Sequence, residues 1–322
     1  MYTNHELHSV EEVCYDNEHV ESIVKIIKKK FDEYFDEFIV TEGGCIATIK
    51  NIKNLAKFFE TNLTNKNKII DCKSKLLYVF NEAIIEFKKD SEVYYELLNE
   101  EAFEEYIDDP SNFKTKLRND CPIIRATLNG NAKELDKYKA DFSNSDANEL
   151  LRVCSNLFYF AKEYSQDKSD KKKYESLEDY QDLEFEDLDT DDYTVYKVIG
   201  GGIKSHLLYK LFPEFFPNRS RQAIWSLWYL TDKDTFKCET DSEFLMIDIE
   251  KNKIQQNYFY PYELFTFYAF QIYFLLKEKA KEIGFELDSK FRYVYVDSFL
   301  TFIANKHEEQ IKVLKGDSNG YF

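Results

Sequence analysis

The sequence has little proline or glycine, and its few cysteines and histidines are scattered. Its 322 residues include five prolines, nine glycines, six cysteines and five histidines. So few helix-breaking residues leave little material for a flexible linker and favour long helices. No CxxC pair occurs, and no histidine stands at zinc-ligand spacing from a cysteine, which excludes a zinc module. The cysteines are typical of reduced core residues in a cytosolic protein.

The sequence also lacks an excess of basic residues and a long apolar run. Sixty acidic residues against forty-three lysines and arginines give a net charge of −17. This excess repels nucleic acid and anionic membranes at long range, but screening over about 8 Å leaves a local basic patch effective. The longest apolar run, residues 263–276, is shorter than the roughly 20 residues of a membrane span. The polar, acidic N-terminal residues do not resemble a signal peptide. We therefore expect a cytoplasmic protein without membrane contact.

What the sequence does contain is helical periodicity. Hydrophobic residues make up 43% of the chain and aromatic residues 17%, which excludes a disordered protein. Apolar residues at three- and four-residue spacing predict helices near 20–40, 45–62, 72–89, 91–107, 146–163 and 261–283. On the first of these, the apolar stripe comprises Val20, Ile23, Ile26, Ile27, Phe31, Tyr34 and Phe35. The segment 243–260 predicts two strands around a charged turn.

These elements predict a mainly α fold of two helical lobes, with one small β-hairpin in the C-terminal lobe. Residues 1–165 would form the N-terminal lobe and residues 194–322 the C-terminal lobe. Between them, residues 166–193 predict an acidic linker or loop, because 174–193 hold ten acids and no base.

Directly after the acidic run comes a basic island that contains three of the nine glycines. It reads KVIGGGIKSHLLYKLFPEFFPNRSRQAIWSLWYL, residues 197–230. Glycines before a helix leave backbone N–H groups exposed, and a helix N-terminus attracts phosphate oxygens. The candidate nucleic-acid-binding residues are therefore Gly200, Gly201 and Gly202, with the cations Lys197, Lys204, Lys210, Arg219 and Arg221.

The order Ile199, Gly200, Gly201, Gly202, Ile203 and Lys204 resembles the hairpin of the helix-hairpin-helix DNA glycosylase superfamily. The resemblance extends over residues 197–230. It implies a DNA-binding element, and it makes Lys204 the candidate amine nucleophile of a lyase. The family also requires an aspartate at the start of the following helix, where this sequence has Asn218. Cysteines for an iron–sulfur cluster are absent as well, since Cys238 is the only cysteine after Cys154. The resemblance therefore implies a catalytically degenerate element.

Other catalytic or metal-binding patterns are incomplete. Asp187, Asp189 and Asp191 begin like a calcium loop, but Asp192 replaces its glycine and Val198 its glutamate. The acids of 241–250 lack the lysine that metal-dependent nucleases commonly place two residues further along a strand. We expect no metal and no cofactor.

The sequence thus predicts a nucleic-acid-associated protein without catalysis, which contacts DNA or RNA through residues 197–221. The alternative is an acidic interaction or inhibitor protein that binds another protein and no nucleic acid. A third interpretation is an active DNA glycosylase or nuclease. The first two differ in whether the five basic side chains converge on one exposed face. We also expect the acidic run to lie near those cations and to compete with phosphate for them.

Overall fold

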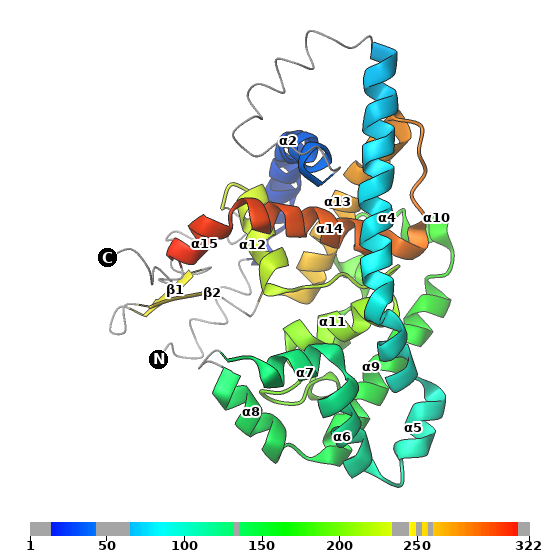
Figure 1. Ribbon diagram of the computed structural model, residues 1–322, viewed down its shortest axis with the longest axis vertical. Coiled ribbons are helices and arrows are strands. Elements are labelled where there is room, and N and C mark those ends of the chain that lie inside the picture. The colour runs from blue at the N-terminus through cyan, green and yellow to red at the C-terminus, as the bar shows by residue number, and fades with distance from the viewer. Residues whose placement is uncertain are drawn as a thin grey trace. The chain divides into compact units, whose positions relative to one another are not determined.

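The computed structural model describes residues 14–42, 65–131, 135–233, 245–248, 253–256 and 260–314. Within these ranges the chain is mainly helical, which confirms the predicted class at that level (Figure 1). The chain divides into two compact units, and each unit is built from stretches that are separate in the sequence.

The first unit comprises residues 1–85, 222–257 and 270–322. Its described helices are α2 (Asn17–Glu42), the start of α4 (Asn65–Leu97), most of α12 (Arg221–Leu230) and α13 (Tyr262–Glu282), the 3-10 turn η5 (Ser289–Phe291), α14 (Arg292–Lys306) and α15 (Glu308–Leu314). Helix α2 packs on α14, because the ring centroids of Phe31 and Phe38 lie 5.2 and 5.4 Å from that of Phe299. The predicted stripe of α2 is buried except at Ile26, which is half-buried.

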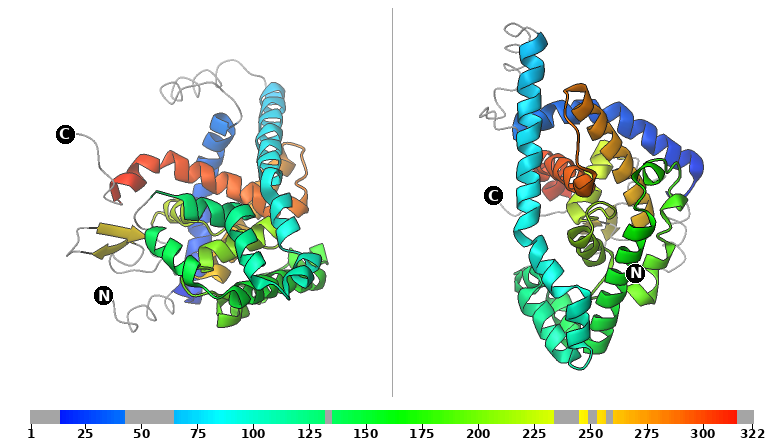
Figure 2. Two further views of the ribbon diagram at one scale, coloured as in Figure 1. Left: turned by 60° about the horizontal axis from the view of Figure 1, so that its bottom comes forward. Right: turned by 90° about the vertical axis from the view of Figure 1, so that its right-hand side faces the viewer.

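The same unit contains two short strands, β1 (Leu245–Asp248) and β2 (Lys253–Gln256). They pair antiparallel, with Ile247 opposite Ile254. Figure 2 shows β1 and β2 as a pair of yellow arrows.

The second unit comprises residues 86–221 and 258–269. After the end of α4 come α5 (Glu100–Tyr106), α6 (Pro110–Asp120), α7 (Pro122–Asn129), α8 (Leu135–Asn144), α9 (Ala147–Asp167), α10 (Lys171–Tyr174), the 3-10 turns η2 (Gln181–Leu183), η3 (Glu186–Asp189) and η4 (Asp191–Tyr193), and α11 (Gly201–Leu211). Helix α9 contacts α5, α6 and α11. Its N-terminus is capped by the Asp146 carboxylate, which accepts from the amides of Asn148 and Glu149.

The structure differs from the sequence prediction at two boundaries. The helices predicted over 72–89 and 91–107 are one continuous helix to Leu97, and the break comes at Asn99, which caps α5. The division into units also differs from the predicted lobes, since the predicted linker 166–193 lies inside the second unit. The predicted helix over 45–62 lies outside the described residues.

Helix α13 ends as predicted. Its last residue is Glu282, and Gly284 follows with a φ of 75°, the left-handed conformation that glycine adopts at helix ends. Helix α9 likewise agrees with the helix predicted over 146–163.

Candidate functional site

The glycines of the basic island open helix α11, in agreement with the prediction that they precede a helix. Gly200 is the N-cap residue, and no side chain caps this end of the helix. Gly200 and Gly202 are exposed, whereas Gly201 lies beneath the Arg219 side chain. A Cβ atom at Gly201 would stand 1.9 Å from the Arg219 Nη2 atom, so a larger residue would require the end of the Arg219 side chain to shift.

Lys204, the candidate nucleophile, is directed into the protein. Its side chain is 5% exposed, and its Nζ donates to the carbonyl oxygen of Leu188 and, at 3.0 Å, to Oγ1 of Thr194. Asp189 Oδ1 lies 3.9 Å from the same nitrogen. Burial lowers the pKa of Lys204, and Asp189 acts in the opposite direction. The amine is therefore held by the acidic segment rather than presented to a ligand.

Two further cations of the basic island are also engaged within the second unit. Lys210 Nζ lies 2.6 Å from Asp90 Oδ1 and 4.9 Å from the ring centroid of Phe87. Arg219 is buried and donates to the carbonyl oxygen of Tyr260. Burial lowers the pKa of Arg219, while Asp189 raises it.

Only Lys197 and Arg221 of the five cations are exposed. Lys197 lies in a tight turn closed by a bridge between Val195 and Ile199, and its φ of 64° is unusual for a residue with a side chain. With the other three cations buried or paired, the five do not converge on one exposed face.

The acidic segment, residues 174–193, is folded onto the second unit. Five of its apolar and aromatic side chains are buried: Tyr174, Tyr180, Leu183, Phe185 and Leu188. The Phe185 ring stacks on Phe216 and Tyr262, with centroids at 5.3 and 5.6 Å and interplanar angles of 15° and 10°. Such a segment is part of a hydrophobic core and not a solvated linker.

The carboxylates of the acidic segment lie at the surface, since nine of the ten acidic residues are exposed. Glu184 pairs with Lys168 at 2.7 Å, and Asp192 pairs with Arg152 at 2.8 Å. Within the described ranges, four of the exposed carboxylates have neither an ion-pair partner nor a hydrogen bond: Glu178, Glu186, Asp187 and Asp191. Asp179 and Asp182 accept hydrogen bonds from backbone amides instead. Part of the expected contact between acids and the basic island is thus present, through Asp189 and Lys204.

One acidic residue beside this segment is buried. Glu263, in the first turn of α13, is 7% exposed, and its Oε1 accepts from the Phe185 amide at 3.4 Å. Burial raises the pKa of Glu263 to about 7, and the negative charges of Glu186, Asp189 and Asp179 add to this rise. Glu263 is not among the residues predicted from the sequence, although its place at the head of the longest apolar run was a usable signal.

The position where the glycosylase family requires an aspartate holds an amide with a neighbouring histidine. Asn218 hydrogen-bonds His206, whose Nε2 lies 3.1 Å from Tyr94 Oη. Burial lowers the pKa of His206 to about 4, so this histidine is neutral near pH 7. Tyr94 Oη also accepts from the Ile123 amide at 2.9 Å. The group acts as an internal hydrogen-bond network that joins α4, α7 and α11.

Comparison with protein-family models, curated proteins and solved structures found no match. The described residues contain no group of three or more His, Cys, Asp or Glu side chains that could hold a metal ion. In this part of the chain, every helix is too short or too polar to cross a membrane.

Proposed function

We propose that this protein binds a positively charged partner protein through its acidic segment, residues 174–193. The observation that carries the proposal is that the segment buries apolar side chains and exposes acidic ones. Five of its apolar and aromatic side chains are buried in the second unit, and nine of its ten acidic residues are exposed. The carboxylates are thereby displayed on a fixed backbone.

A fixed array of like charges suits recognition of a cation-rich segment. Side-chain carboxylates that repel one another gain by contact with lysine or arginine, and complementary potentials raise the rate of encounter. A backbone already ordered by buried side chains loses less entropy on binding than a flexible acidic tail. Glu178, Glu186, Asp187 and Asp191 remain available for such pairs.

The competing interpretation, a nucleic-acid contact at the basic island, has fewer cations at its disposal. Lys204, Lys210 and Arg219 already bind groups within the chain. Phosphate contact would have to displace those bonds, against the repulsion of the nearby acids.

The test is fluorescence anisotropy with a labelled lysine- and arginine-rich peptide, and with labelled duplex DNA and single-stranded RNA, from low to physiological salt. The variant replaces the four available carboxylates with amides, as Glu178→Gln, Glu186→Gln, Asp187→Asn and Asp191→Asn. A control with the same change in net charge carries Glu101→Gln, Glu104→Gln, Glu105→Gln and Asp108→Asn, four exposed acids at or beside α5.

We expect the peptide to bind the wild-type protein and to bind the first variant at least about fivefold more weakly, since each exposed ion pair contributes roughly 0.2–1 kcal/mol. The control should bind nearly as well as the wild type. Equal loss in both variants would indicate a general charge effect and contradict the proposal. Binding of DNA or RNA without binding of the peptide would instead support the nucleic-acid interpretation.

A further inference from the structure

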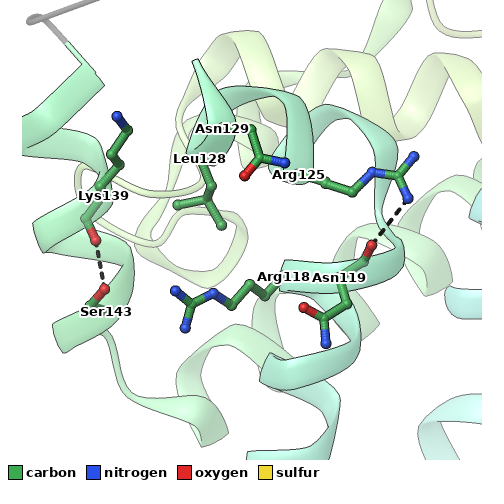
Figure 3. A pocket seen from close by; sticks show the side chains of 7 residues that line it. All are labelled: Arg118, Asn119, Arg125, Leu128, Asn129, Lys139 and Ser143. Carbon is green, nitrogen blue, oxygen red and sulfur yellow. Dashed lines mark hydrogen bonds between the residues drawn. The ribbon is translucent and has the colours of Figure 1, made fainter. Parts of the chain in front are cut away.

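A basic hollow lies in the second unit, away from the basic island in the sequence. Its volume is about 260 Å³. Figure 3 shows that it is lined from three helices, α6, α7 and α8. The lining residues are Arg118, Asn119, Arg125, Leu128, Asn129, Lys139 and Ser143. Three cations and no acid line this hollow, in a chain whose net charge is −17.

Hydrogen bonds between the three helices hold the walls in place. Lys114 of α6 donates to the carbonyl oxygens of Ser143 and Ser145 at 2.9 and 2.6 Å, which fixes the C-terminal end of α8. Arg125 of α7 donates through Nη1 to the carbonyl oxygen of Asn119 at 3.2 Å. The hollow is therefore built by side chains that bridge helix ends and does not depend on a ligand to form.

The cations of the hollow differ in what they already bind. Lys139 pairs with Asp136 at 3.3 Å. Arg118 and Arg125 are exposed and have no carboxylate partner within the described residues, although Arg125 uses one donor on Asn119. In Figure 3 the guanidinium of Arg118 extends beneath Leu128.

We propose that this hollow binds a small phosphate-bearing molecule. A guanidinium presents a planar fork of donors that matches two phosphate oxygens, and Arg118 has its fork available. The side-chain amides of Asn119 and Asn129 add neutral donors around it, whereas the Ser143 hydroxyl already donates to the carbonyl oxygen of Lys139 at 2.8 Å. A hollow of this size suits a phosphate with a small body attached, and the acidic chain disfavours a long polyanion such as duplex DNA. This site is independent of the acidic segment.

Isothermal titration calorimetry at physiological salt tests the proposal with inorganic phosphate, pyrophosphate, adenosine monophosphate and adenosine. The three phosphate compounds should bind, and adenosine should not. Arg118→Gln should weaken binding at least about tenfold, because a charge-assisted hydrogen bond is lost. Lys116→Gln is the matched control: it removes one positive charge from the same helix without touching the hollow, and it should change affinity less than about twofold.

Thermal unfolding of each variant serves as the check of folding. Asn129→Asp, which places a carboxylate in the hollow, is a second variant and should abolish binding through repulsion. The proposal is overturned if the three phosphate compounds fail to bind at millimolar concentration, or if Arg118→Gln and Lys116→Gln have equal effects. Binding of duplex DNA that survives Asn129→Asp would also place the anion contact elsewhere.

Discussion

Whether a basic residue is buried or exposed depends on the hydrogen-bond acceptors and negative charges that its neighbours supply. Lys204 and Lys197 lie seven residues apart in one basic island, yet one is buried on a carbonyl oxygen and the other is exposed. Burying a cation is costly unless it is hydrogen-bonded, and Leu188, Thr194 and Asp189 provide that compensation for Lys204. A site predicted from residue type alone cannot distinguish these two environments.

Gly201 is the residue whose replacement tests the packing around Arg219. Alanine is normally preferred to glycine in a helix by about 1 kcal/mol, so Gly202→Ala, which meets nothing within 4 Å, should leave the protein as stable or more stable. Gly201→Ala should instead destabilise it by roughly 1–3 kcal/mol, because its methyl group displaces the Arg219 guanidinium from the Tyr260 carbonyl. Urea unfolding of both variants measures the difference. Equal stabilities would show that Arg219 moves without cost.

Glu263 should make stability depend on pH near neutrality. Its pKa is about 7 in the folded protein and about 4.5 in the unfolded chain, so the folded state binds more protons between these values. The stabilisation is present below about pH 4.5 and is lost as the pH rises through 7, by an amount on the order of 3 kcal/mol.

Glu263→Gln removes this titration while retaining an oxygen that can accept from Phe185. In urea unfolding at pH 5 and pH 8, the wild type should lose more stability than the variant over the interval. His206, whose pKa is lowered, titrates with the opposite sign, but it contributes equally to both proteins and cancels in the comparison. An identical pH dependence of wild type and variant would show that Glu263 does not carry the effect.

At the scale of elements, the acidic segment shows how a core can be hidden in a charged sequence. Its buried residues at 174, 180, 183, 185 and 188 follow neither a helical nor a strand period. Residue 174 ends α10, and the other four lie in or directly before the 3-10 turns η2 and η3. The spacing of these residues therefore predicts no buried element, and the many carboxylates between them favour a linker. A deletion of this segment would remove core side chains as well as charge.

Leu188→Ala tests whether the acidic segment is packed into the core or is a solvated linker. Leu188 is 1% exposed, and loss of a buried leucine side chain typically costs about 2–4 kcal/mol. Glu186→Ala, an exposed change in the same turn, should stay within about 0.5 kcal/mol of the wild type. Chemical denaturation of the two variants gives the comparison, and equal small effects would mean that the segment is not part of the core.

At the scale of the whole molecule, the sequence was sufficient to predict helices whose apolar residues are regularly spaced. The stripe of α2 and the extents of α9 and α13 follow from the spacing of apolar residues, and they are confirmed. The hollow of α6–α8 could not be found this way, because Arg118, Arg125 and Ser143 come together only through the packing of three helices. The division into units escaped prediction for the same reason, since it depends on contacts between distant stretches.

The interleaved order of the two units has a consequence for biosynthesis. The second unit is complete only with residues 258–269, and the 36 residues 222–257, which belong to the first unit, are made in between. At about 5–20 residues per second, the ribosome needs roughly 2–7 s for that interval. Throughout it, Phe185 and Phe216 have been synthesised without the Tyr262 ring that stacks on Phe185. Folding of this unit must therefore wait for translation, and a chain released early exposes aromatic surface to chaperones and proteases.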